Sequence, residues 1–309
     1  MESIKILATG KYLPNNKITN NKLEEQFNLS PGWILDRTGI QNRFYTGEDI
    51  TVLAINAVKD LINKSKFDIN KVDLIITATT STKKIMPSIS FKIQKEFDIK
   101  NCKCFDILAG CSGYINAFDI ARKYIATNDS KYALVIGVDK LSECINKTDI
   151  NIVSLLGDGA SASILGSTKD KKIYYSNIES IGQIGDILTY EIPNNIYMDG
   201  KQVYRFGITK PVENIKKLLD KSNIAIEDIK YIIPHQSNLK MLKRICKELH
   251  IEESKMYLNI ENVGNTFCAS IPIALAEMFE QKLLKQGDKI ILVGYGGGVN
   301  LGSILLEIW

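Results

Sequence analysis

The residue of this sequence best suited to covalent chemistry is Cys111. It stands in the stretch Gly-Cys-Ser-Gly, between an apolar run that ends at Ala109 and a helical pattern over residues 114–125. Glycines let the backbone turn sharply and let a substrate come close, which a cysteine used only for packing does not need. A helix N-terminus also lowers the pKa of a thiol. We therefore expect Cys111 to be a nucleophile, with a small buried side chain as the alternative.

The chain has two histidines, and they stand in different settings. His235 follows Pro234 at the tip of an apolar run and precedes the polar residues 236–238. A histidine in such a place is suited to acid–base chemistry or to orienting a carbonyl group. His250 ends a helical pattern, where surface exposure or a favourable interaction with the helix end explains it. The sequence favours His235 as the functional histidine.

Asn265 and a glycine run supply candidate hydrogen-bond donors. Asn265 follows Gly264, and its amide could donate to a developing oxyanion without adding charge, although a turn residue would look the same. The stretch "GYGGGVNLGS", residues 294–303, exposes backbone N–H groups after an apolar run. These groups could hold an oxyanion or a phosphate. The spacing does not fit a dinucleotide fingerprint.

The elements that must position these residues alternate between apolar strands and amphipathic helices. The strand-like runs cover residues 72–80, 131–139, 231–238 and 289–298, and the helical patterns cover 52–65, 90–97, 238–250 and 271–284. Continuous apolar strands separated by helices are typical of sheets buried on both faces. The sequence therefore predicts an α/β protein.

A repeat along the chain indicates how the strands are arranged. Val72 aligns with Ile229 and Gly137 with Gly294, each pair 157 positions apart, and Cys111 falls near Asn265 at an offset of 154. Successive matches at nearly one offset predict two duplicated halves, 1–166 with the cysteine and 167–309 with the histidine and asparagine. Ligands bind at the carboxyl ends of strands in such sheets, so His235 should meet the other two residues there.

Composition excludes several classes of protein. The 309 residues are 45% hydrophobic with a formal net charge of +4, which is ordinary globular composition and too weakly basic for a nucleic-acid binder. No apolar run approaches the roughly 18 residues of a membrane span. Six cysteines in a chain of this length indicate reduced thiols, and the C-x-C of Cys102 and Cys104 lacks the partners of a metal site. We expect a cytoplasmic protein.

Taken together, the motifs resemble those of β-ketoacyl-acyl-carrier-protein synthase III, in the thiolase-like superfamily. The resemblance covers nearly the whole chain and rests on eight motifs in the family's order: "WILDRTGIQNR" at 33–43, "ATTSTKKIMPS" at 78–88, "AGCSGY" at 109–114, "GDGASASIL" at 157–165, "MDGKQVYRF" at 198–206, "PHQSN" at 234–238, "GNT" at 264–266 and "GYGGG" at 294–298. It implies a five-layer αβαβα fold built from two duplicated halves, a homodimer and a decarboxylating Claisen condensation.

The resemblance also implies roles for the residues singled out above. Cys111 would attack an acyl thioester and hold the acyl group. His235 and Asn265 would stabilise the enolate formed when malonyl-acyl-carrier protein loses carbon dioxide. The backbone amides of Cys111 and Gly297 would form the oxyanion hole. The reaction would need no metal or bound cofactor, because the CoA thioester of an acyl-CoA is a substrate.

Residues that would bind the primer partly depart from the family pattern. Trp33 and Arg37 match residues that contact the CoA nucleotide. Ile150 stands where many members have an arginine that clamps the adenine, so the sequence leaves the CoA affinity open.

Three further positions concern the acyl group and the carrier protein. Met86 occupies a position, often Phe in the family, that shapes the acyl pocket from across the dimer. Phe267 replaces a small residue just after the GNT motif, near the acyl or entry region, and would contact the substrate. Lys240 replaces a frequent arginine associated with carrier-protein docking. The primer stays open among acetyl, branched and specialised acyl groups. The leading hypothesis is an initiating condensing enzyme of fatty-acid synthesis. The alternatives are an acyltransferase or ketosynthase of a specialised pathway, and a non-catalytic carrier-binding relative, which retention of the three polar residues disfavours.

Overall fold

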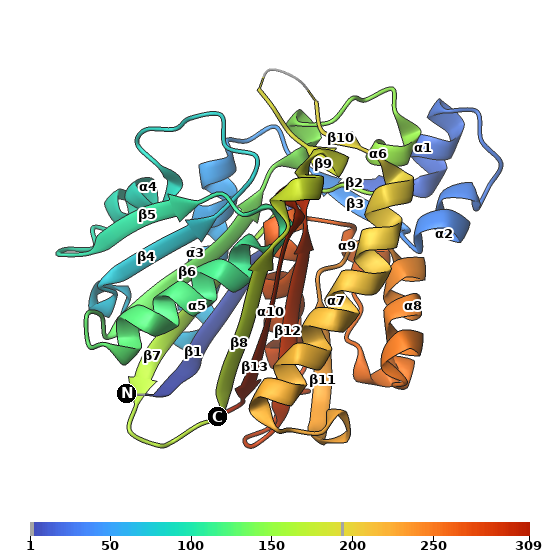
Figure 1. The fold of residues 1–309 in the computed structure, drawn as a ribbon. Coiled ribbons are helices and arrows are strands. Elements are labelled where there is room, and N and C mark those ends of the chain that lie inside the picture. The colour runs from blue at the N-terminus through green and yellow to red at the C-terminus, as the bar shows by residue number, and fades with distance from the viewer. Residues whose placement is uncertain (1–2, 193–194) are drawn as a thin grey trace.

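The chain forms two sheets separated and flanked by helices (Figure 1). The computed structural model describes residues 3–192 and 195–309. Its α-helices are α1 (Asn20–Gln26), α2 (Trp33–Thr38), α3 (Ile50–Ser65), α4 (Ile89–Glu96), α5 (Gly113–Ala126), α6 (Ile150–Val153), α7 (Gly200–Ser222), α8 (Leu239–Leu249), α9 (Ile260–Val263) and α10 (Ser270–Glu280). Within the described residues, no helix is both long enough and apolar enough to cross a membrane.

The first sheet has the strand order β1-β7-β6-β4-β5. These strands are β1 (Ser3–Tyr12), β4 (Leu74–Ala78), β5 (Lys103–Ile107), β6 (Tyr132–Asp139) and β7 (Gly159–Thr168). Strand β4 is parallel to β5 and β6, whereas β7 runs antiparallel to both β6 and β1. All five residues of β4 are buried, as expected of a continuous apolar strand covered on both faces.

The second sheet repeats this arrangement with the order β11-β12-β13-β8. Its strands are β8 (Tyr174–Ser180), β11 (Ile229–Pro234), β12 (Lys289–Gly296) and β13 (Asn300–Glu307). Strand β12 is parallel to β11 and antiparallel to β13, as β6 is to β4 and β7. A single parallel bridge between Ile232 and Met256 stands where the first sheet has β5. The two sheets therefore share one topology.

Helices cover both faces of each sheet and produce five layers. Helices α5 and α10 lie between the sheets, where they share one apolar core with strands of both. Helices α3 and α4 cover the outer face of the first sheet, and α7 and α8 cover the outer face of the second (Figure 1). The predicted five-layer αβαβα fold is confirmed.

The chain passes from one sheet to the other between Thr168, where β7 ends, and Tyr174, where β8 begins. The predicted division after residue 166 falls just before the end of β7. Shorter elements lie together at one end of the molecule (Figure 1): β2 (Asn16–Thr19), β3 (Asn42–Tyr45), β9 (Leu188–Thr189) and β10 (Tyr197–Met198). Together with α1, α2 and α6, they cover the end at which β6 and β12 stop.

Candidate active site

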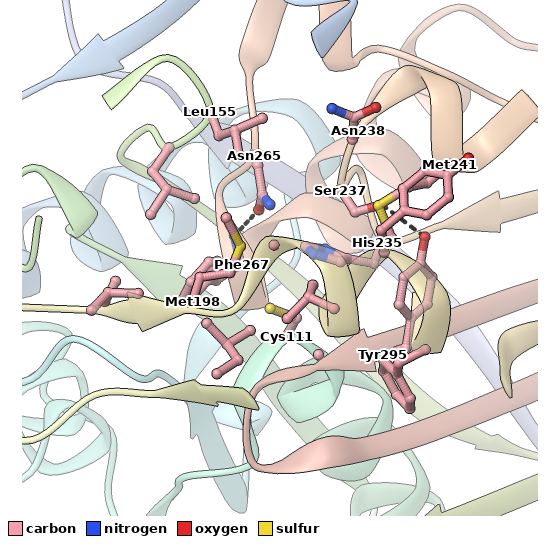
Figure 2. A pocket seen from close by; sticks show the side chains of 18 of the residues that line it. Cys111, Leu155, Met198, His235, Ser237, Asn238, Met241, Asn265, Phe267 and Tyr295 are labelled. Carbon is pink, nitrogen blue, oxygen red and sulfur yellow. Dashed lines mark hydrogen bonds between the residues drawn. The ribbon is translucent and has the colours of Figure 1, made fainter. Parts of the chain in front are cut away.

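One cavity at this end of the sheets contains Cys111, His235 and Asn265 in its wall. Figure 2 shows the three side chains converging on it from separate elements: the start of α5, the end of β11 and the loop after α9. The rest of the wall is mainly apolar and includes Ile152, Leu155, Leu156, Leu188, Ile196, Met198, Val203, Phe206, Met241 and Phe267. The structure thus brings together the cysteine of one half and the histidine and asparagine of the other.

Cys111 lies in a single 3-10 turn, η2 (Gly110–Ser112), that leads directly into α5. The glycines around it are required by close approach of the backbone. A Cβ atom on Gly296 would lie 2.6 Å from the Cys111 sulfur. Gly110 has φ +55°, and a Cβ there would lie 2.4 Å from the carbonyl oxygen of Gly297. The glycines noted in the sequence therefore allow the turn that carries the thiol to pack directly against the glycine run at the end of β12.

Burial controls the charge on this thiol. Cys111 is 2% exposed, and burial raises its pKa to about 12, while the backbone amides of Gly297 and of Cys111 itself oppose the rise. The expectation of a lowered pKa is wrong, because the loss of hydration outweighs the favourable dipoles. At neutral pH the side chain is a thiol, so its acylation must include removal of a proton. The two amides that favour negative charge on the sulfur are those expected to form the oxyanion hole.

His235 is held by its backbone at the end of β11, where its N–H donates to the Val293 carbonyl over 2.8 Å. The His235 and Tyr295 rings form a T-shaped pair with their centroids 5.5 Å apart, and the Tyr295 hydroxyl is fixed by a 2.8 Å hydrogen bond with the Ser237 hydroxyl. Nδ1 is buried without a hydrogen-bond partner in the described part of the chain. Burial lowers the pKa of His235 to about 3. The imidazole is therefore neutral at physiological pH.

Asn265 is fixed at both its backbone and its side chain. Its N–H donates to Leu155 O and its carbonyl accepts from Gly157 N–H, both over 2.9 Å. The side-chain oxygen Oδ1 accepts the Phe267 N–H over 3.0 Å, the contact drawn in Figure 2. Because the oxygen end of the amide is engaged, the Nδ2 end is the one that can donate to a group in the cavity.

A second hollow adjoins the cavity and contains Trp33 and Arg37. It shares Ile152, Leu155, Met198, Gly200 and Asn238 with the cavity wall, so the two spaces meet. The Arg37 guanidinium lies over the Trp33 ring at 3.9 Å. Ile150 is half-buried and packs with the apolar cluster around Cys111, so this position supplies no positive charge for binding CoA.

The other expected site residues occupy different places. Phe267 is buried, lines the cavity and belongs to the same apolar cluster as Cys111. Met86 is 87% exposed and lies outside this cavity, so it could reach an acyl group only in another copy of the chain. Lys240 is exposed in the first turn of α8, where its N–H donates to the cavity residue Asn238. Within residues 3–192 and 195–309, no three or more His, Cys, Asp or Glu side chains are arranged so that they could hold a metal ion.

Two residues beside the nucleophile were missed by the sequence analysis. Asp139 ends β6 and Cys268 precedes α10, and both are fully buried. A signal for them was present, because Asp139 lies 157 positions before Gly296 and Cys268 lies 157 positions after Cys111. The offset that aligned the strands therefore also aligns the surroundings of the thiol.

Known proteins with the same features are found by sequence and by structure. The family model described as 3-Oxoacyl-[acyl-carrier-protein (ACP)] synthase III matches residues 105–182, and that of its C-terminal part matches residues 219–308. The β-ketoacyl-[acyl-carrier-protein] synthase III of Clostridium novyi is 38% identical over 99% of both chains, and that of Clostridium perfringens is 39% identical over the full length of both. The crystal structure of 3-oxoacyl-[acyl-carrier-protein] synthase III from Aquifex aeolicus matches with a TM-score of 0.95 and 36% identity, covering 99% of this chain and 100% of that one.

The paired sheets with their shared central helices are those of the thiolase-like fold, on which this cavity is built. The fold and the cavity place this protein in the class of the ketoacyl synthases, which are acyltransferases. The chain belongs to the β-ketoacyl-[acyl-carrier-protein] synthase III family.

Proposed function

We propose that this enzyme starts fatty-acid synthesis by condensing an acyl-CoA primer with malonyl-acyl-carrier protein to give 3-oxoacyl-acyl-carrier protein. One observation carries the proposal: a thiol, an imidazole and a carboxamide line a single, largely apolar cavity. An apolar wall suits an acyl chain, and the three polar groups suit a thioester exchange followed by formation of an enolate.

In the first half-reaction, the Cys111 sulfur attacks the carbonyl carbon of the acyl-CoA. The carbonyl oxygen becomes an oxyanion, which the N–H groups of Cys111 and Gly297 stabilise. Donors of this kind are worth about 3 kcal/mol each. The C–S bond to CoA then breaks, and the proton lost by Cys111 goes to the departing CoA thiolate.

In the second half-reaction, malonyl-acyl-carrier protein enters and its free carboxylate leaves as carbon dioxide. The electron pair of the broken C–C bond forms an enolate, whose oxygen accepts hydrogen bonds from neutral His235 and from Nδ2 of Asn265. The enolate carbon attacks the acyl group on Cys111, and the released thiolate recovers a proton from solvent. A low pKa of His235 fits this role, because a neutral imidazole donates a hydrogen bond without needing protonation.

The primer and the carrier arm would reach Cys111 through the hollow at Trp33 and Arg37, which opens into the cavity. Lys240 at the start of α8 would contribute positive charge to the docking of the acidic carrier protein. Decarboxylation itself supplies the carbanion, so the proposed reaction requires no metal or bound cofactor, and CoA enters and leaves with the substrate.

We also propose that the enzyme is a homodimer formed along β5. This strand is an edge of the first sheet, so one of its sides pairs with no strand of the described residues 3–192 and 195–309. Apolar side chains nearby are exposed to an unusual degree: Ile85 by 82%, Met86 by 87%, Phe91 by 50% and Leu108 by 74%. Exposed apolar groups around an open edge favour pairing with a second copy.

The test is a panel of acyl-CoA primers presented with malonyl-acyl-carrier protein. We expect mass spectrometry to find an acyl adduct on Cys111, and product analysis to find 3-oxoacyl-acyl-carrier protein and carbon dioxide in equal amounts. The absence of both adduct and carbon dioxide with every primer would overturn the proposed activity. An adduct without condensation on malonyl-acyl-carrier protein would instead assign the enzyme to a different acyl transfer.

A further inference from the structure

The duplicated fold places a second buried cysteine at the position equivalent to the nucleophile. Cys268 lies in the 3-10 turn η7 (Phe267–Ala269), which leads into α10 as the turn of Cys111 leads into α5. Both helices belong to the central layer, and the two turns contact each other. Cys268 has no exposure, so it cannot receive a substrate. The proposed mechanism gives it no part in the reaction.

The thiol of Cys268 is directed at the peptide that precedes the nucleophile. Its sulfur donates to the carbonyl oxygen of Gly110 over 2.9 Å. A Cβ atom on Gly113 would lie only 3.0 Å from the same sulfur, which shows how tightly it fits under the start of α5. The S–H group therefore contacts the main chain next to Cys111 at residues that do not line the cavity.

The geometry of that peptide links the contact to the reaction. The carbonyl of Gly110 and the N–H of Cys111 belong to one planar trans peptide, in which they point in opposite directions. Holding the oxygen in place therefore sets the direction of the N–H. This N–H is one of the two amides that favour negative charge at the sulfur. Gly110 adopts φ +55°, and its carbonyl accepts two donors: the Gly113 N–H within the 3-10 turn and the Cys268 thiol from the other half of the chain.

We propose that Cys268 is a positioning residue that aims the Cys111 N–H into the oxyanion hole. This inference rests on the proposed condensation, in which that N–H stabilises both tetrahedral intermediates. A hydrogen bond accepted by a peptide carbonyl also polarises the peptide and makes its N–H a better donor. Cys268 thus acts through Gly110 and does not touch the substrate.

Asp139 holds Cys268 in place. Its carboxylate accepts the Cys268 N–H over 2.9 Å, the N–H groups of Thr80 and Ser81 over 2.7 and 3.0 Å, and the Ser81 hydroxyl over 2.8 Å. Burial and the nearby carboxylate raise the pKa of Cys268 well above its usual range. The side chain therefore remains a thiol, which is the form that can donate to Gly110.

The experiment compares Cys268→Ala, Cys268→Ser and the control Cys246→Ala. Cys246 is buried in α8 with its sulfur 3.6 Å from that of Met256, so its loss removes a thiol far from the peptide of interest. With a primer labelled with carbon-13 at its carbonyl, infrared difference spectroscopy of the acyl-enzyme reports the hydrogen bonds that the oxyanion hole makes. Steady-state kinetics is measured in parallel.

We expect Cys268→Ala to lower kcat about two- to fivefold with little change in KM, the effect of losing one weak donor that acts in the transition state. The thioester carbonyl band should move to higher wavenumber. Cys268→Ser keeps a donor and should retain the wild-type band, and Cys246→Ala should change neither measurement.

An unshifted band in Cys268→Ala would overturn the inference, even if the rate fell. A shifted band in Cys268→Ser would also overturn it, and this variant decides the matter if the alanine variant does not fold. Failure of the proposed function looks different, because the wild-type enzyme would then form no acyl-enzyme band at all.

Discussion

At the level of single residues, the structure separates the roles of Cys111 and His235. The sulfur must accept the acyl group, whereas a neutral imidazole of low pKa is suited to donating a hydrogen bond to the enolate oxygen. We expect His235→Ala to slow decarboxylation of malonyl-acyl-carrier protein about 10²–10³-fold but acylation less than about tenfold. The two half-reactions are followed by carbon dioxide release and by mass spectrometry. Equal losses would contradict this division, and Cys111→Ala, which forms no adduct, is the control.

Phe267 should limit the length of the primer. It is buried beside Cys111 in the cavity wall. We expect Phe267→Ala to raise the ratio of kcat/KM for hexanoyl-CoA over acetyl-CoA by about tenfold or more, since each methylene that gains room is worth a severalfold change. The measurement is the condensation rate with each primer. Phe279→Ala, on α10 and outside the cavity wall, should leave the ratio unchanged; a similar change there would count against the prediction.

The sequence was sufficient to identify the candidate catalytic side chains but not to predict their pKa values. Cys111, His235 and Asn265 could be found because small or polar residues interrupt apolar runs at strand ends. The pKa of the thiol could not be predicted, since it depends on a cavity wall assembled from residues distant in the sequence, such as Leu156, Leu188 and Ile196. Cys268 was missed for a related reason: the groups it contacts, the Gly110 carbonyl and the Asp139 carboxylate, lie 158 and 129 positions away in the sequence.

At the level of elements, the turn of Cys111 and the glycine run at the end of β12 pack too closely to admit a side chain at Gly110. We expect Gly110→Ala to lower the free energy of unfolding by about 2 kcal/mol or more, because the residue has φ +55° and its Cβ would collide with the Gly297 carbonyl. Acylation should fall as well, since both oxyanion-hole amides would move. Chemical denaturation and adduct formation measure the two effects.

Gly47→Ala is the matched control for this substitution, because a Cβ there meets nothing within 4 Å. Its stability and acylation should match those of the wild type. If Gly110→Ala behaved like Gly47→Ala, the close approach of the two loops would not be required for activity.

Elements with a simple apolar pattern were predictable from sequence. The expected strand at 131–139 is β6, Tyr132–Asp139, and the expected helix at 52–65 is α3, Ile50–Ser65. Helix α7 was not predicted, because lysines and Pro211 dilute its apolar face. The helix expected to run to residue 284 ends at Glu280, where the chain turns and Lys282 takes a positive φ. Where a helix such as α10 ends depends on tertiary contacts, which a local sequence pattern does not show.

At the level of the whole molecule, the position of β5 at the edge of its sheet leads to a prediction about the homodimer. We expect Leu108→Glu to convert a dimer into a monomer, because it places a charge among apolar side chains at the end of that strand. Light scattering on a sizing column measures the mass. Lys230→Glu adds an acidic residue at the edge strand of the other sheet and should leave the dimer intact. A wild-type monomer would refute the dimer.

The different surroundings of Cys111 and Cys268, which lie in equivalent turns, also limit the number of acyl groups that one chain can carry. Two thiols sit at matching helix starts, yet one faces an open space and the other is walled in beside a carboxylate. Loading should therefore saturate at a stoichiometry of one per polypeptide, however much primer is supplied and although six cysteines are present.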